Sequence, residues 1–298
     1  MASETVYRLE EETQEQLPSQ SFWRMGLRRL MKNPLAIIGF SILFLEILVA
    51  IFATQLAPYD PYEPNYANNK AAPSAEHIFG TDHLGRDVFS RVLQGSRISL
   101  PVGLGVVSIA VLLGVPWGAA VGYFGGLFDM GSMRLVDLIQ AFPLIVLAIV
   151  VIIVWGTEMY KLMIVLGFVF SIQYTRLVRG VVLSLREEEY TLAARAMGAS
   201  HIRILFQHLI PNLLNVVVVL ATFHIPEVIL LVAALSYLGL GAQPPSAEWG
   251  AMLNGAKNLL RFVPMVTIAP GVAIMITLLA VNFIGDALRD ALDPTLRN

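Results

Sequence analysis

Ionisable residues within long apolar runs are the first sign of chemistry in this sequence. Glu46 lies near the middle of one run, and His224 and Glu227 lie close together in another. A charged side chain at the centre of a bilayer costs about 2.5 to 3.5 kcal/mol on insertion scales, so we expect these groups to face protein or a polar path. Because carboxylate and imidazole groups exchange protons, the three residues could form a proton relay. Together with Asn282 in a third run, they are the candidates for lining a pathway.

Structural roles are the alternative for these residues. Glu46 could make a hydrogen bond that only holds two helices together, and His224 and Glu227 could do the same. Pro226 lies between the latter two and would kink a helix, which would free a backbone carbonyl nearby. The residue types alone leave both interpretations open.

Several kinds of active site are excluded by the motifs that the sequence lacks. It contains no GxxxxGK[ST] phosphate-binding loop, so it does not hydrolyse ATP by that route, and no HExxH zinc motif. The absence of cysteine excludes disulfides, thiol catalysis and cysteine metal sites. No basic cluster with interleaved aromatic residues indicates nucleic acid binding. We therefore expect no catalytic residue, no metal site and no cofactor in this chain.

The apolar runs are the elements that must position the polar candidates. Hydrophobic residues make up 56% of the 298 residues and charged residues 14%, against about 25% charged in an ordinary soluble domain. The runs have the length that crosses a bilayer as a helix, roughly 20 residues. The predicted spans are residues 35–57, 98–123, 140–155, 161–182, 213–240 and 264–284. The sequence thus predicts an all-α integral membrane protein, with six transmembrane helices in one domain over residues 35–298.

The first 34 residues precede this domain and are predicted to form a cytoplasmic tail and an interfacial helix. Residues 1–18 are polar and acidic, without the basic start of a secretory signal. In residues 21–33, Arg24, Arg28 and Lys32 are four apart, opposite apolar side chains. That pattern is typical of an amphipathic helix lying on lipid headgroups.

Two connections and one span carry further expectations. Glycines along the second span should allow close helix packing, as small residues do in membranes; they are Gly103, Gly105, Gly114, Gly118 and Gly122. The stretch between the second and third spans should be a short connection, in which Asp129, Arg134 and Asp137 are solvated or paired with one another.

Residues 190–212 are too charged to cross a bilayer and too regular to be a simple loop. An alanine-rich half favours helix, Gly198 interrupts it, and apolar residues then recur at helical spacing until Pro211 ends the pattern. We expect two short helices hinged at Gly198. Another protein could approach the bare glycine backbone closely, with Arg195 offering a polar contact beside it. A hairpin that contacts nothing is the alternative.

This stretch resembles the cytoplasmic loop of ABC importer permeases. The residues at the family spacing are Ala193, Ala194, Gly198, Leu209, Ile210 and Pro211. Leu192 stands where the motif usually begins with Glu, so that role is given to no residue. The resemblance implies a coupling helix that sits in a cleft of an ATPase subunit. The residues implied at that contact are Ala193, Ala194, Arg195, Gly198, Ala199, Ser200 and Pro211.

A second resemblance narrows the family to the branch of dipeptide, oligopeptide and nickel importers. It is carried by FGTDHLGRDVFSRVLQGSRISL at residues 79–100 and is continued by ALSYLGLG at 234–241 and by the end of the sixth span. The branch usually has Glu where Val232 stands here. In the first of these stretches, opposite charges should pair: Asp82 and Asp87 with Arg86, Arg91 and Arg97.

The resemblance implies a C-type permease subunit of an ATP-driven importer with the type I permease fold. The implied partners are a second homologous permease, two cytoplasmic ATPase subunits that carry ATP and Mg, an extracytoplasmic solute-binding protein, and the lipid bilayer. The chain would form half of a translocation pathway for peptides or a related solute in the prokaryotic cell membrane, without being an enzyme itself. A proton-coupled secondary transporter that uses Glu46, His224 and Glu227 is the alternative.

The distribution of basic residues predicts that both termini are cytoplasmic. With that orientation, the lysines and arginines outside are Lys70, Arg86, Arg91, Arg97, Lys161, Lys257 and Arg261, and the rest of the 20 lie inside. This excess inside follows the positive-inside rule. It also places residues 190–212 in the cytoplasm, where a coupling role requires them.

Overall fold

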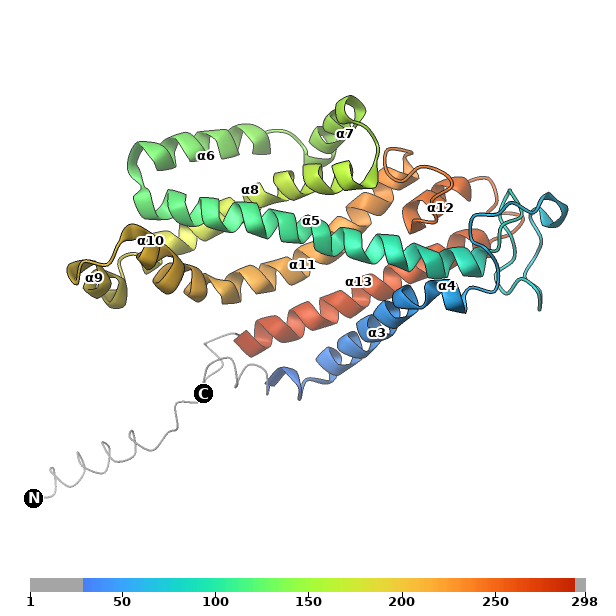
Figure 1. Ribbon diagram of the computed structural model, residues 1–298, viewed down its shortest axis with the longest axis horizontal. Coiled ribbons are helices and arrows are strands. Elements are labelled where there is room, and N and C mark those ends of the chain that lie inside the picture. The colour runs from blue at the N-terminus through green and yellow to red at the C-terminus, as the bar shows by residue number, and fades with distance from the viewer. Residues whose placement is uncertain (1–28, 293–298) are drawn as a thin grey trace, which may run out of the picture.

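The structure is a computed structural model that describes residues 29–292 as a long helical bundle (Figure 1). The transmembrane-length helices are α3 Pro34–Ile51, α5 Val88–Phe124, α8 Met159–Leu185, α11 Ile210–Tyr237 and α13 Met265–Leu292. The shorter ones are α4 Ala53–Leu56, η1 Tyr66–Asn68, α6 Gly126–Gln140, α7 Leu144–Trp155, α9 Glu189–Ala196, α10 His201–Arg203, the π-helical η2 Ile204–Leu209, and α12 Trp249–Gly255. The predicted all-α class is confirmed.

Five helices are long and apolar enough to cross a membrane, and a sixth span exists if α6 and α7 count as one broken span. The third span was predicted over residues 140–155, of which α7 covers Leu144–Trp155, and α7 is bent by 85° relative to α6. With 12 residues, α7 is only about 18 Å long, too short to cross the hydrocarbon core alone. The bend lies next to Pro143, which caps α7.

Other predicted boundaries change because helices continue through polar residues. α5 begins at Val88, ahead of the predicted 98, because Asp87 caps it by accepting a hydrogen bond from the Ser90 amide. α13 continues to Leu292 instead of ending at 284. The predicted connection between the second and third spans is the helix α6. Most of the predicted N-terminal tail and interfacial helix lies outside the described residues.

The centre of the bundle is the packing of α5 against α8. Gly114, Gly118 and Gly122 are four apart on α5, and a Cβ atom on each would lie 2.3 Å, 2.6 Å and 2.9 Å from backbone oxygens of α8. Only glycine therefore allows the two helices to approach this closely, which confirms the packing role predicted for these residues. Phe170 and Tyr174 of α8 are fully buried in the same core.

The two ends of the bundle carry different structures (Figure 1). At one end, here called the coupling end, α9 and α10 project beyond the core. At the other, here called the loop end, residues 57–87 and α12 cover the ends of the long helices. The pairs Asp129–Arg179 and Asp137–Arg176 connect α6 to α8, so the two aspartates pair with arginines of α8, whereas the sequence predicted that they are solvated or paired with Arg134.

Candidate functional site

The coupling end is built around a tight turn at Gly198. Its φ of +79° is a conformation that side-chain-bearing residues rarely adopt. The Gly198 amide donates to Arg195 O and the Ala199 amide to Ala194 O, both at 3.0 Å, the paired bonds of a Schellman motif that ends α9. Ser200 then starts α10 by accepting a hydrogen bond from the Arg203 amide. The predicted helix–glycine–helix hinge is present.

The sequence predicted that the second helix ends at Pro211, but the helix continues past this residue. From His201 the chain is helical without interruption to Tyr237, through the π-helical turn η2 and into α11. Proline has no backbone N–H, and its ring crowds the carbonyl four residues earlier. The wider π turn before Pro211 leaves room for that ring, so α10, η2 and α11 form one rod. Residues 190–212 are here called the coupling segment.

Several large apolar side chains at the coupling end face solvent, and three of them are more than half exposed. Met197 is 82% exposed, Ile202 71% and Phe206 59%, whereas Leu205 and Leu209 are buried. The apolar period in the sequence contains both groups and cannot separate the exposed face from the buried one. Exposed apolar residues that cluster on a projecting segment mark an interaction surface.

The projecting segment is tied to the bundle at a few points. The Tyr123 hydroxyl at the end of α5 lies 2.9 Å from Nδ1 of His201, and the Arg195 guanidinium lies 5.6 Å above the Tyr123 ring. The Thr191 hydroxyl donates to Leu185 O at 2.8 Å. α9 and α10 therefore contact α5 through Tyr123 and α8 through Thr191.

Within the bundle, Glu46 is held between α3 and α13. The Thr277 hydroxyl donates to Glu46 Oε1 at 2.9 Å, while Glu46 Oε2 is buried without a hydrogen-bond partner among the described residues. This bond joins two neighbouring helices. It fits the structural role considered for Glu46.

His224 and Glu227 lie close together on α11, and His224 faces α8. His224 is buried, its Nδ1 lies 3.1 Å from the Tyr174 hydroxyl, and its ring packs edge-on against Phe170. Its Nε2 lies 4.0 Å from a carboxylate oxygen of Glu227, whose side chain is half exposed. Within the described part of the chain, no hydrogen bond or ion pair links Glu46 to these two residues. The third run's candidate, Asn282, is half-buried on α13.

At the loop end, a buried ionic cluster joins segments distant in sequence. Asp82 Oδ2 lies 2.7 Å from Arg86 Nη2 and 3.7 Å from Arg91 Nε. Arg91 also donates to the carbonyls of Pro61, at 2.7 Å, and Ser246, at 2.9 Å. These contacts tie the start of α5 to residues 57–87 and to the segment before α12.

The predicted pairing is right for Asp82 and wrong for Asp87. Asp87 contacts His77 at 3.0 Å and caps α5, accepting hydrogen bonds from Ser90. Arg97 is exposed. The cap holds the Asp87 carboxylate at the helix start, where it meets His77 from the preceding loop. Spacing along the sequence cannot show that contact.

Comparison with known proteins decides the family. Residues 114–298 match the family described as binding-protein-dependent transport system inner membrane component, and residues 21–73 match the N-terminal TM domain of oligopeptide transport permease C. The chain belongs to the permeases of binding-protein-dependent ABC importers. In this family ATP hydrolysis takes place on partner subunits, so the permease is not itself an enzyme.

Curated relatives match the permease along nearly its whole length. It is 43% identical to the dipeptide transport system permease DppC of Alkalihalophilus pseudofirmus over 285 residues, 96% of this chain and 94% of the relative. It is 43% identical to the glutathione transport system permease GsiD of Escherichia coli over 282 residues, 94% and 91%. With the oligopeptide transport system permease OppC of Bacillus subtilis, identity is 39% over 279 residues, 94% and 92%.

A solved structure confirms the type I permease fold. The MetNI methionine ABC transporter in an inward-facing conformation superposes with a TM-score of 0.54 at 19% sequence identity, over 68% of this permease and 96% of that chain. At that identity the likeness concerns the fold alone. The expected fold class and the importer family are confirmed.

The residues that the sequence implied at the ATPase contact lie in different environments. Those exposed in the permease are Ala193, Arg195, Gly198, Ser200 and Pro211. Ala199 is half-buried, and Ala194 is buried in the core beneath α9. Ala194 therefore packs α9 against the core and does not face a partner. Met197, Ile202 and Phe206, which the motif did not single out, carry the exposed apolar surface.

Proposed function

We propose that this chain is one of two permease subunits of an importer for short peptides, driven by two ATPase subunits that carry ATP and Mg and supplied by an extracytoplasmic binding protein. The single observation that carries this proposal is the projecting coupling segment with its exposed apolar face. A segment of this kind gives an ATPase subunit a surface to hold while the pathway opens and closes.

Contact with the ATPase is assigned to Gly198 and the surface around it. Ala193, Arg195 and Ser200 lie beside the exposed side chains of Met197 and Ile202. Because the chain has no cysteine, single cysteines test the contact cleanly. Ile202→Cys should cross-link to a cysteine in the ATPase cleft, with a yield that changes on ATP addition. Ser74→Cys, exposed at the loop end of the bundle, is the control, and equal yields at both sites would contradict the assignment.

Movement at this contact has two direct routes into the bundle. α10, η2 and α11 form one rod that ends near the loop end, and Tyr123 connects the segment to α5. A displacement of α9 and α10 therefore moves the helix that carries His224 and Glu227, which supports these two residues as pathway candidates. Glu46 on α3 and Asn282 on α13 gain no such support. Alternating access needs such a discrete rearrangement of packed helices.

The coupling end is placed in the cytoplasm, with both termini, and the loop end outside the cell membrane. The excess of basic residues on the coupling side supports this orientation. Ser74→Cys at the loop end should react with an impermeant maleimide added outside, and Ser200→Cys only after the membrane is opened. The reverse pattern would overturn the orientation.

The cargo class follows from the relatives, whose names give dipeptides, oligopeptides and glutathione. These cargoes are short peptides that differ in their side chains. A permease with few polar groups inside the bundle has few contacts with which to recognise a particular side chain. We assign cargo selection mainly to the binding protein. Exchanging the binding protein should change the transported peptides more than His224→Ala or Glu227→Ala; a switch of cargo caused by these substitutions alone would contradict this assignment.

A further inference from the structure

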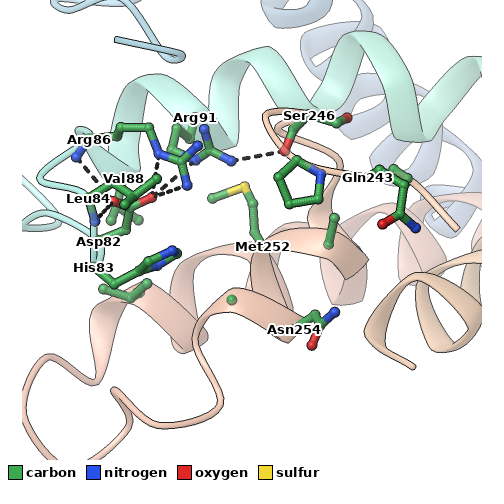
Figure 2. Close-up of a pocket in the computed structure, with 15 residues that line it drawn as sticks. Asp82, His83, Leu84, Arg86, Val88, Arg91, Gln243, Ser246, Met252 and Asn254 are labelled. Atoms are coloured by element: carbon green, nitrogen blue, oxygen red, sulfur yellow. Dashed lines mark hydrogen bonds and ion pairs between the residues drawn. The ribbon is translucent and has the colours of Figure 1, made fainter. Parts of the chain in front are cut away.

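A small cavity lies at the loop end, between the start of α5 and α12 (Figure 2). Its volume is about 190 Å³. Figure 2 shows Asp82 and the guanidinium groups of Arg86 and Arg91 along one side, and His83 and Met252 across from them. Aliphatic side chains form most of the remaining wall, among them Val88 and Val266.

The charges that border this cavity do not balance. Arg86 and Arg91 are 6% and 4% exposed, and in the described part of the chain both form ion pairs only with Asp82, which is 5% exposed. The nearby Asp87 is occupied by His77 and Ser90. Two buried guanidinium groups thus share one carboxylate. Backbone carbonyls of Pro61 and Ser246 also accept hydrogen bonds from Arg91, but they supply no full negative charge. Burying two positive charges that share one counter-ion is costly, so the arrangement favours an additional anion at the cavity.

The shape and chemistry of the cavity select among anions. A guanidinium group binds carboxylate and phosphate well, through paired N–H donors. Gln243 and Asn254 also line the cavity, but Figure 2 shows them away from Arg86 and Arg91. A phosphate or sulfate held by the two arginines would place further oxygens against Val88 and Met252, where they lose water without gaining hydrogen bonds. A carboxylate on a short aliphatic stem has two oxygens for the arginines and an apolar part for Val88, Met252 and Val266.

We infer that this cavity is a binding site for a carboxylate on a short aliphatic stem, presented from the loop side of the membrane. The site is separate from the coupling segment and from His224 and Glu227. Its occupant could be an acidic side chain of the binding protein or the terminal carboxylate of a peptide, and that part of the inference depends on the proposed function.

Butyrate is the probe for the site itself, and the uncharged butyramide is its matched control. Butyrate should raise the melting temperature of the purified full-length chain in detergent in a saturable way. In NMR spectra, the signal of ¹³C-labelled butyrate should broaden when the chain is added. Butyramide should do neither. No effect of butyrate, or an equal effect of sulfate at the same ionic strength, would overturn the inference.

A variant that fills the cavity keeps the test independent of the ionic cluster. Ala251 lines the cavity on α12, and Ala251→Leu should weaken butyrate binding about ten-fold, or more. Ala75→Leu, at an exposed position in residues 57–87 outside the cavity, should bind butyrate as the unsubstituted chain does. Retained binding in Ala251→Leu would place the anion elsewhere and overturn the site.

The complete importer distinguishes the two sources. If the binding protein supplies the carboxylate, Ala251→Leu should raise about ten-fold the concentration of loaded binding protein needed for half-maximal ATPase stimulation. If the peptide supplies it, uptake of free-acid peptides should fall while uptake of C-terminally amidated peptides is unchanged. If the Ala251→Leu importer behaves as the unsubstituted importer does in both assays, the inference that a carboxylate enters the cavity during transport is contradicted. Failure of the unsubstituted importer to transport peptides would instead contradict the proposed function, because butyrate binding is measured on this chain alone.

Discussion

The two ends of the bundle are stabilised in different ways. At the loop end, the side chains that join the segments are buried: Arg91 reaches Asp82 and backbone carbonyls of two other segments, and the Trp249 indole donates to Val92 O at 3.0 Å. At the coupling end, α9 and α10 are joined to α5 by the Tyr123–His201 hydrogen bond and the Arg195–Tyr123 contact, while Met197 and Ile202 face solvent.

This difference indicates which end moves as a unit and which adapts to a partner. Buried charges that share partners hold their segments in one arrangement, because separating any two leaves a charge unpaired. An exposed helix–turn–helix held by few contacts opens locally at low free-energy cost. The following substitutions break each end in turn, from the largest expected effect to the smallest.

Asp82→Asn should have the largest effect. It leaves Arg86 and Arg91 buried without their carboxylate, and removing one partner of a buried ion pair costs about 3 to 5 kcal/mol. Melting of the purified chain should shift to a clearly lower temperature, and less protein should accumulate in the membrane. The control is Glu158→Gln, which breaks the exposed pair with Lys161 and should leave melting unchanged. Equal shifts in both variants would mean that the loop end is not rigidly held.

Gly198→Val should be next, at about 1 to 3 kcal/mol of local strain, because valine does not tolerate a φ of +79°. The long helices are untouched, so the protein should still insert, but loaded binding protein should no longer stimulate ATP hydrolysis in reconstituted importer. Gly198→Asn should lose less, since asparagine adopts positive φ more readily.

Gly180→Ala is the matched control for the turn. Gly180 lies in α8 with ordinary helical geometry, and a Cβ atom added there would meet no other atom within 4 Å. ATPase stimulation in the Gly180→Ala importer should therefore be normal. Full stimulation and full uptake by Gly198→Val would show that the coupling segment is only a connecting hairpin.

Tyr123→Phe should have a smaller effect. It removes the hydroxyl that meets His201 but keeps the ring beneath Arg195, and a single hydrogen bond contributes about 0.5 to 1.5 kcal/mol. We expect normal accumulation and a partial loss of ATPase stimulation. Tyr123→Ala, which also removes the ring, should lose more; normal ATPase stimulation in Tyr123→Phe would contradict a link through the hydroxyl.

Glu46→Gln should have the smallest effect. The amide oxygen can still accept the Thr277 hydrogen bond, so the contact between α3 and α13 is kept. Peptide uptake should be unchanged between pH 6 and pH 8, roughly the range over which a proton relay would respond. A strong loss of uptake, with normal protein level, would show that Glu46 has a role in transport.

The sequence by itself determined the membrane class, the approximate positions of the apolar helices, the turn at Gly198 and the family. These features depend on local properties: the length of apolar runs, the conformational freedom of glycine, and motifs whose residues are close in the chain. The pairing of Asp82 with Arg86 was also within reach, because the two residues are four apart.

Only the tertiary structure decided the features that depend on contacts between distant segments. In the structure, α6 and α7 are bent relative to each other next to Pro143, and the helix continues through Pro211. Ile202 is exposed while Leu205 is buried, and Asp87 contacts His77. A periodic apolar pattern has the same appearance whether its neighbours are lipid, protein or solvent. The chain's partners in space therefore set where each helix ends and which side of it is available for binding.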